Sequence, residues 1–319
     1  MMAPLLTGCD LVADIGGTNA RFAIHHLGEF LREQVLPCKD FARFADAFRH
    51  YCDTQQVQPA RAAIAIANPV LGDRIQMTNH HWAFSIAETR GELGLTVFNV
   101  VNDFEALALS LPYLPAADLK QLGGSEPVVG AVKAVIGPGT GLGVASLASS
   151  HGHWQALPAE GGHVSFPART AREWAMVECL APKFDNHVSA ERLISGPGLA
   201  LMHQALAQID GVSIESLTPA EITARALSNQ DPRCHEVLEL FCIALGNVAG
   251  NLALTVGARG GVYIGGGIVP KLGDFFSRSG FRAAFEDKGR FDHYLGPIPV
   301  YVIHSPYPAF VGAVRSLSV

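Results

Sequence analysis

Three observations predict an α/β protein built from two domains. The chain has 319 residues, a length that suits about two domains, and its apolar fraction of 49% is enough for two full-sized cores. Each half opens with a strand, a glycine-threonine turn and a second strand, and then alternates strands with helices. This alternation predicts mixed β-sheets flanked by helices, and the repeated opening indicates duplication of one α/β unit.

In the first half, "DLVADIGGTNARFAIHH" predicts a strand, a glycine-rich turn and a second strand, and "EFLREQVLPC" can supply a third strand. Apolar residues at helical spacing predict a helix over Phe41 to Cys52. The segment "RAAIAIANPV" predicts a short apolar strand that ends in Asn-Pro. The segment "SIAETRGELG" then predicts a helix with Ser85 as its cap and Gly94 just past its end.

The second half repeats this opening, since "KAVIGPGTGLGVASLA" again predicts a strand, a glycine turn and a strand, and "HWQALP" could be a third strand. A helical region is expected from Thr170 to Leu254, with breaks at "SGPG" and "NQDP". The strand "GGVYIGGG" leads into a helix near Val269, and the strand "IPVYVIHS" precedes a C-terminal helix that starts around Pro308. The proline- and glycine-rich segment "LPYLPAADLKQLGGSEP" is the expected domain boundary.

Charge and cysteine usage exclude several classes of function. The net charge is -6 and no basic stripe is visible, so we expect no nucleic-acid partner. No run approaches the roughly 18 apolar residues of a membrane span, so we expect no membrane partner. The six cysteines form no C-x-x-C pair, which argues against a zinc site and for reduced thiols in a cytoplasmic protein.

The predicted strand Val97 to Val101 ends in Asn102 and Asp103, directly before a helical pattern. One explanation is local, because Asn102 can cap the helix and Asp103 then lies where the helix dipole favours negative charge. The other explanation is chemical, with Asp103 as a catalytic carboxylate. The local residues alone leave both explanations open.

Two glycine turns, "DIGGTN" from Asp14 to Asn19 and "GPGTGLG" from Gly137 to Gly143, can bind phosphate. Glycines let successive backbone N–H groups converge on an anion, and Asp14 could hold Mg²⁺ directly or through water. Neither turn has a Walker A sequence, and a strand follows the second where a dinucleotide fingerprint requires a helix. The alternative is a pair of ordinary hairpin turns. A third cluster, "IGGGIVPK", opens a helix whose N-terminus could approach a nucleotide, or it is a plain strand-to-helix turn.

A cluster of polar residues in the second half suits a sugar. Glu160 and His163 flank two glycines in "PAEGGHVSF", which indicates a shaped loop, and Glu191 lies near a helix start capped by Ser189. Carboxylates with histidine and asparagine match sugar hydroxyls, which both donate and accept hydrogen bonds. Asn79 is a weaker candidate for the same pocket. Alternatively, Glu191 is an ordinary first-turn acid and His163 a structural histidine.

Six segments together resemble the bacterial ATP-dependent glucokinases, and they occur in that family's order over nearly the whole chain. They are "DIGGTNARFAI", "NDFEA", "GPGTGLGVA", "EGGH", "SAERLISGPG" and "GGGIVP". The resemblance implies the actin-like and hexokinase-like ATPase superfamily, with two ribonuclease H-like α/β domains around a cleft. It further implies a small domain of residues 1–113 plus 304–319 and a large domain of residues 114–303.

The resemblance also implies roles for residues that match the family's motifs. Asp103 matches the catalytic base, and the glucose contacts are Asn102, Asp103, Glu160, His163 and Glu191. Asp14 is the implied Mg²⁺ ligand. The implied ATP contacts are Ala13, Asp14, Ile15, Gly16, Gly17, Thr18, Asn19, Gly137, Gly139, Thr140, Gly141, Gly265 and Gly266.

One departure separates this chain from the related ROK sugar kinases. Those proteins carry a cysteine-rich zinc motif after Glu-x-Gly-His, whereas "VSFPARTAREW" follows here and the next cysteine is Cys179. We therefore expect the non-ROK glucokinase family and no structural zinc. The resemblance to that family further implies a homodimer that phosphorylates glucose in the first step of glycolysis.

Three other functions can be weighed against a glucose kinase. A kinase for another hexose, such as mannose or glucosamine, fits the same residues. A sugar-independent actin-like ATPase would share the glycine turns but would not need Glu160, His163 and Glu191. A sugar-sensing regulator would need a DNA-binding helix-turn-helix, for which a first strand at about Asp10 leaves no room.

Overall fold

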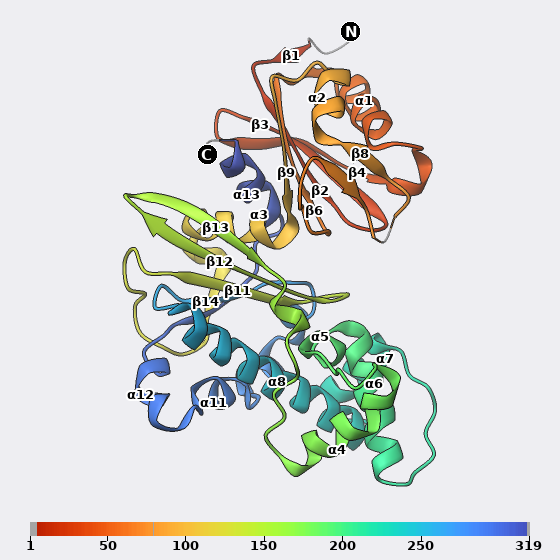
Figure 1. The fold of residues 1–319 in the computed structure, drawn as a ribbon, viewed down its shortest axis with the longest axis vertical. Coiled ribbons are helices and arrows are strands. Elements are labelled where there is room, and N and C mark those ends of the chain that lie inside the picture. The colour runs from red at the N-terminus through yellow and green to blue at the C-terminus, as the bar shows by residue number, and fades with distance from the viewer. Residues whose placement is uncertain (1–4, 79, 318–319) are drawn as a thin grey trace. The chain divides into compact units, whose positions relative to one another are not determined.

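The computed structural model describes residues 5–78 and 80–317 (Figure 1). Its contacts divide the chain into two compact units, Met1–Leu114 with Ser305–Val319, and Pro115–His304. Each unit carries one mixed β-sheet flanked by helices, as the sequence predicts.

The sheet of the first unit has five strands in the order β4-β3-β2-β6-β9. β2, β3 and β4 are successive antiparallel neighbours, whereas β2, β6 and β9 are parallel. The carboxyl ends of these three parallel strands therefore meet at one edge, where Ile15 pairs with Ile66 and Ile66 with Asn102. The strands are β2 (Asp10–Ile15), β3 (Asn19–His26), β4 (Glu29–Pro37), β6 (Arg61–Ile66) and β9 (Val97–Asn102).

Two short strand pairs lie outside this sheet: β1 (Leu6–Thr7) with β5 (Val57–Gln58), and β7 (Arg74–Gln76) with β8 (Ala83–Ser85).

The helices of the first unit follow the predicted order with one shifted start. α1 begins at Phe44 rather than at Phe41, because Cys38–Asp40 form a 3₁₀ turn and Arg43 is still extended. The predicted cap of α2 is confirmed, since the Ser85 side chain accepts from the Glu88 N–H. The helices are α1 (Phe44–Gln55), α2 (Ile86–Glu92), α3 (Asp103–Ser110) and α13 (Pro308–Ser316).

The two faces of this sheet are covered by segments from opposite ends of the chain. Leu11, Ala13 and Ile15 belong to a core that also contains aromatic residues from α1 and the segment after it. The intervening Val12 packs instead, with Ala23 and Ala63, against Phe310 and Ala313 of α13. The alternation along β2 thus makes the C-terminal helix part of the first unit.

The second unit has a six-stranded sheet in the order β10-β15-β14-β11-β12-β13. β11, β12 and β13 form the predicted antiparallel opening, and β11, β14 and β15 are parallel. The strands are β10 (Leu119–Gln121), β11 (Lys133–Pro138), β12 (Leu142–Ser150), β13 (His153–Ala159), β14 (Val262–Ile264) and β15 (Val300–Ile303).

The helical region of this unit is interrupted at the two expected segments. The helices are α4 (Ala171–Leu180), α5 (Ala190–Leu193), α6 (Gly196–Ile209), α7 (Pro219–Leu227), α8 (Pro232–Val256), α9 (Val269–Leu272), α10 (Asp274–Arg278), α11 (Phe281–Glu286) and α12 (Asp292–Leu295). Ser195 of "SGPG" is the cap of α6, and residues 229–231 of "NQDP" lie between α7 and α8.

Helix α8 is the centre of the second core. By length and composition alone it could cross a membrane, which differs from the expectation that no apolar run approaches a membrane span. However, 67% of its most apolar window is buried inside the unit. Gly246 and Gly250 lie so close to the backbone of α11 that a Cβ at either position would overlap it. This burial explains why α8 is apolar on nearly all sides, as expected for the core helix of a water-soluble protein.

We expect Gly312→Ala to destabilise the first unit. A Cβ at this position of α13 would overlap the Ala106 carbonyl oxygen of α3, and backbone cannot yield as a flexible side chain does. Overpacking of this kind costs about 1–3 kcal/mol or more. The matched control is Gly91→Ala in α2, where a Cβ has open space and alanine favours the helix by up to about 1 kcal/mol. Urea unfolding of both variants tests this, and equal stabilities would contradict the packing of α13 on α3.

Candidate active site

Polar residues follow three parallel strands at the carboxyl edge of the first sheet. β2 ends in Asp14 and Ile15 before the first glycine turn, β6 leads to Asn68, and β9 leads to Asp103. Because these strands are parallel and in register, the three segments are neighbours at one edge. Ligands of open α/β sheets bind characteristically at such carboxyl ends.

Asn102 joins two of these segments. Its Oδ1 accepts from the backbone N–H of Phe104 at 2.9 Å and of Glu105 at 3.3 Å, which confirms the predicted helix cap. Its Nδ2 donates to the Asn68 carbonyl at 3.2 Å. The Asn68 side chain in turn accepts from the Thr78 N–H at 3.1 Å and is 8% exposed. These bonds fix the start of α3 and therefore the backbone of the next residue, Asp103.

Asp103 is a carboxylate in a protected environment. Burial raises its pKa to about 6, hydrogen bonds from the Phe104 and Asp103 backbone oppose the rise, and the negative charge of Asp14 adds to it. A group with this pKa is ionised at neutral pH and is also basic enough to accept a proton from a reacting hydroxyl. The structural and the catalytic explanations of the Asn102–Asp103 pair are thus compatible, because Asn102 caps α3 while the Asp103 carboxylate stays available to accept a proton.

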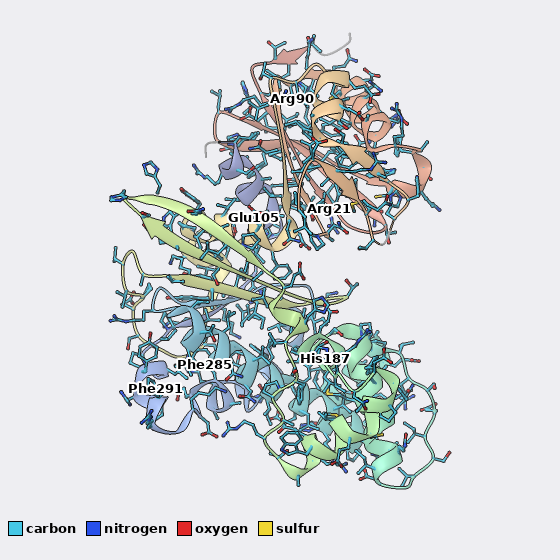
Figure 2. All side chains as sticks on the ribbon, viewed as in Figure 1. Arg21, Arg90, Glu105, His187, Phe285 and Phe291 are labelled. Carbon is cyan, nitrogen blue, oxygen red and sulfur yellow. The ribbon has the colours of Figure 1, made fainter. Side chains whose placement is uncertain are left out.

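The first glycine turn has a basic neighbour that sequence reasoning missed. The turn is closed by a hydrogen bond of 3.0 Å from Gly16 N–H to the Asn19 carbonyl. Directly opposite Asp14 on β3 lies Arg21, whose guanidinium donates to the Asp14 carboxylate at 3.0 Å (Figure 2). Burial raises the pKa of Asp14 and the charge of Arg21 opposes that rise. The missing signal was the hairpin register, since antiparallel pairing across "GGT" brings Arg21 beside Asp14.

In the second unit the other two glycine clusters pack on each other. They follow β11 and β14, which are parallel neighbours with Ile136 beside Ile264. A Cβ on Gly137 would collide with the backbone of Gly265, and a Cβ on Gly266 with that of Pro138. Gly266 also has a φ of +77°, a conformation that favours glycine. Only glycine fits these positions, so the two clusters form one surface with close-lying backbone N–H groups.

The tip of the turn after β11 is anchored to the helices that follow. Gly139 N–H donates to the Gly141 carbonyl at 2.8 Å, and Gly196 N–H at the start of α6 donates to the Gly139 carbonyl at 2.8 Å. Thr140 lies at the tip between these bonds. The turn that sequence analysis assigned to phosphate is therefore held in one conformation by backbone hydrogen bonds.

The polar cluster expected for a sugar is assembled within the second unit. Glu160 Oε2 lies 3.7 Å from His163 Nε2, and the two side chains are 61% and 60% exposed. Gly162 between them packs so closely on Leu142 that a Cβ would overlap its carbonyl. Glu191 at the start of α5 accepts from the Leu142 N–H at 2.9 Å. All three side chains are thus arranged around the beginning of β12, directly after the Gly137–Gly141 turn.

His163 also borders a polar cavity of about 240 Å³. The guanidinium of Arg192 lies 4.5 Å from the ring centroid of Phe184 in its wall. Ser189 and Arg192 lie in the motif "SAERLISGPG". The residues of the wall between Lys183 and His187 belong to no motif and could not be predicted from the sequence; His187 is labelled in Figure 2. The cavity is lined by His163, Lys183, Phe184, Asp185, His187, Ser189 and Arg192.

The sequence-predicted residues therefore fall into two groups. Asn102, Asp103 and the Asp14 to Asn19 turn belong to the first unit, and Glu160, His163, Glu191 and the other glycine turns belong to the second. Asn79, a weaker sugar candidate, lies outside the described residues.

Comparison with known proteins decides between the families that these two groups permit. A family model described as Glucokinase matches residues 11–318. A glucokinase from Neisseria meningitidis is 52% identical over 309 residues, which cover 96% of this chain and 94% of the relative. The chain belongs to the glucokinase family. A glucokinase from Aromatoleum aromaticum is 51% identical over 98% of this chain and 96% of its own length, and members of this family are ATP-dependent sugar kinases.

Solved structures of glucokinases share the fold. A glucokinase from an Antarctic psychrotroph superposes with a TM-score of 0.89 at 35% identity, covering 97% of this chain and 98% of that one. A Balamuthia mandrillaris glucokinase solved in complex with glucose has a TM-score of 0.81 at 24% identity, over 98% and 94% of the two chains. A ROK glucokinase from Streptomyces griseus reaches only 0.62 at 18% identity, over 97% and 99%. The expected glucokinase family and the mixed α/β fold are confirmed.

The raised pKa of Asp103 predicts a pH-dependent contribution to stability. Because its pKa is about 6 in the folded state against an ordinary 3.8, the fold favours the protonated carboxyl. This contribution is complete below about pH 4 and is lost as the pH rises through 6, up to about 3 kcal/mol. Asp103→Asn mimics the neutral group and should escape the loss.

The free energy of unfolding of wild type and Asp103→Asn should therefore be similar near pH 4, and the variant should be more stable at pH 7.5. The matched control is Asp53→Asn at an exposed position of α1, which should show no such divergence. Parallel pH profiles for wild type and Asp103→Asn would show that the carboxylate is well solvated, against the burial described here.

Proposed function

We propose that this glucokinase-family chain transfers the γ-phosphoryl group of MgATP to the 6-hydroxyl of glucose, giving glucose 6-phosphate and ADP. The observation that carries the proposal is Asp103, a carboxylate of raised pKa at the sheet edge that also holds a glycine turn. Asp103 accepts the hydroxyl proton and orients the oxygen for attack in line with the leaving ADP. Phosphoryl transfer otherwise depends mostly on positioning and on stabilising charge.

ATP is held by the glycine turns in this proposal. The backbone N–H groups of the Asp14 to Asn19 and Gly137 to Gly141 turns face the phosphates, with the hydroxyls of Thr18 and Thr140 as further donors. The Gly265 and Gly266 turn lies on the adenosine side. The tight packing of Gly137 on Gly265 supports this assignment, because a surface without side chains lets a polyphosphate approach the backbone closely.

Mg²⁺ is proposed to accompany ATP near Asp14. Mg²⁺ keeps several waters and takes one or two carboxylates together with phosphate oxygens, so a single partly exposed carboxylate fits it. The Asp14 side chain is 27% exposed and shares its charge with Arg21. A bound Mg²⁺ would neutralise charge on the phosphate oxygens, and Arg21 is placed to add a second cation at the same turn.

Glucose is proposed to be contacted by Asn102, Asp103, Glu160, His163 and Glu191. The Glu160 and His163 side chains are largely exposed and close enough to share one hydroxyl. Glu191 already uses one carboxylate oxygen on the Leu142 N–H, which leaves the other for a sugar hydroxyl. Small-molecule substrates alone, a homodimer and a cytoplasmic location complete the proposal. The homodimer follows from the resemblance stated above, whereas the cytoplasmic location rests on the cysteine pattern and the absence of a nucleic-acid partner on the charge pattern.

ADP release across a panel of hexoses tests the reaction. We expect turnover with glucose and slow release without sugar, because water is a poorly positioned acceptor. Asp103→Asn should lower turnover at least roughly 10²–10⁴-fold, since an amide cannot accept the proton, while glucose still binds. The cap of α3 is Asn102, which this variant leaves unchanged, so the variant should fold.

Other outcomes of this assay have distinct meanings. A folded Asp103→Asn variant with near-normal turnover would remove Asp103 from the chemistry. Faster release with mannose or glucosamine than with glucose would move the proposal to another hexose. Equal release with and without sugar would favour a sugar-independent ATPase.

Glu160→Gln should weaken glucose binding more than ATP binding. A hydrogen bond to a charged group contributes about 1.5–3 kcal/mol, so the glucose Kd should rise roughly tenfold or more. The matched control is Thr140→Val at the tip of the glycine turn, which should weaken ATP binding more than glucose binding. Isothermal titration of both ligands to both variants measures this, and a loss of ATP affinity alone in Glu160→Gln would disprove the assignment of that loop to sugar.

A further inference from the structure

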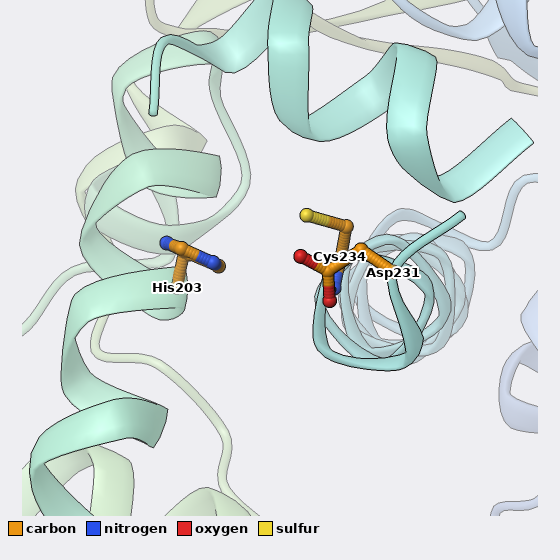
Figure 3. A group of neighbouring side chains, drawn as sticks. All are labelled: His203, Asp231 and Cys234. Atoms are coloured by element: carbon orange, nitrogen blue, oxygen red, sulfur yellow. The ribbon is translucent and has the colours of Figure 1, made fainter. Parts of the chain in front are cut away.

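A second cluster of potential ligand side chains lies in the second unit, among residues that the proposed kinase reaction does not use. His203 projects from α6 toward the first turn of α8, where Asp231 and Cys234 lie (Figure 3). One ligand atom from each of the three side chains lies within 4.8 Å of the others. His203 is 2% exposed, Cys234 is fully buried, and Asp231 is half-buried.

The local structure holds two of these side chains in place. Asp231 is the cap of α8, and its Oδ1 accepts from the N–H groups of Arg233 at 2.8 Å and Cys234 at 3.3 Å. The cap uses one carboxylate oxygen, and the Asp231 carboxylate also accepts a hydrogen bond from the Cys234 thiol. Cys234 follows Asp231 by three residues, so both face the same side of the first helical turn, which is the side of α6 in Figure 3.

The Cys234 thiol is fully buried and is therefore not accessible as a nucleophile. Burial raises the pKa of the Cys234 thiol to about 11, with the neighbouring Asp231 adding to the rise. A thiol of this pKa is neutral at pH 7 and reacts slowly, unlike the low-pKa cysteine of a catalytic pair. Burial also lowers the pKa of His203, so its imidazole is neutral and offers a lone pair.

The nearby cations do not fill the space between these side chains. Arg233 donates to the Asp210 carboxylate at 2.7 Å, and Arg225 is paired with Glu215. A neutral imidazole, a thiol that can lose its proton and a carboxylate oxygen are together the three ligand types of protein zinc sites.

We propose that His203, Asp231 and Cys234 bind one thiophilic divalent cation of the Zn²⁺ class, with a fourth position for water. Binding forms bonds from the metal to an imidazole nitrogen, a carboxylate oxygen and the Cys234 sulfur, and the thiol proton passes to solvent. No electron is transferred. The metal would join α6 to the start of α8 and close a chain segment of residues 203–234 that contains α7.

This inference differs from the expectation of no zinc site, which rested on the absence of paired cysteines. A site with one cysteine has no C-x-x-C signature, and its histidine lies on a separate helix. The inference is independent of the proposed kinase reaction, because it concerns side chains outside that site and is tested by metal binding.

The test uses the full chain stripped of metal with a chelator and then titrated with Zn²⁺ or Co²⁺. We expect one equivalent to bind, Tm to rise by about 5 °C or more at about 100-fold excess over Kd, and Co²⁺ to give a thiolate charge-transfer absorption. Cys234→Ser and His203→Gln should abolish the absorption and the Tm shift. The matched control is Cys242→Ser, a buried cysteine two turns further along α8 outside the cluster, which should keep both.

Two results would overturn the proposal. The first is metal binding that persists in Cys234→Ser, which would assign it to the partly exposed Cys52 or Cys179. The second is no Tm shift and no cobalt absorption in the wild-type chain, which would leave the three side chains as a hydrogen-bonded cluster. Should Cys234→Ser not fold, Asp231→Asn retains the helix cap and replaces it as the test of ligand loss.

Discussion

The parallel pairing of strands whose ends carry polar residues is the constraint on which the candidate site depends. Ile15, Ile66 and Asn102 are aligned across β2, β6 and β9, so whatever follows each strand emerges at the same edge. A shift of any strand by one residue would turn its side chains to the other face of the sheet. Asp103 would then no longer lie beside the Asp14 turn, although every residue of both motifs would still be present.

The second unit applies the same constraint to its backbone. β11 and β14 are parallel neighbours. In the two turns that follow them, Gly137 packs on the backbone of Gly265, and Gly266 packs on the backbone of Pro138. Here the pairing register of the two strands determines where the backbone N–H groups of the turns lie, since the contact between the turns is made by backbone atoms. The two units thus use one topology for different purposes, with a carboxylate at the edge of the first sheet and a bare peptide surface at the edge of the second.

The features that could be predicted from the sequence are those that depend on interactions between residues close together in the chain. The caps of α2 and α3 could be predicted because Ser85 and Asn102 bond to N–H groups within three residues. The glycine turns were equally visible, since their conformation depends on residue type. Long-range contacts could not be predicted: Arg21 contacts Asp14 only through the hairpin register. Glu191 was recognised as a site residue, but its hydrogen bond with the Leu142 N–H joins residues about fifty positions apart.

The position of α13 has a consequence for the order in which the molecule is made. This helix, with Phe310 and Ala313, covers the face of the first sheet that includes Val12 and Ala63, and Asn99 donates to the Ser316 carbonyl at 2.6 Å. Domains generally fold as the ribosome releases them, from the N-terminus onward. Here the N-terminal sheet cannot cover its second face until the last residues have been translated, whereas residues 115–304 of the second unit form a continuous segment. The unit that is synthesised first is therefore the last to complete its core.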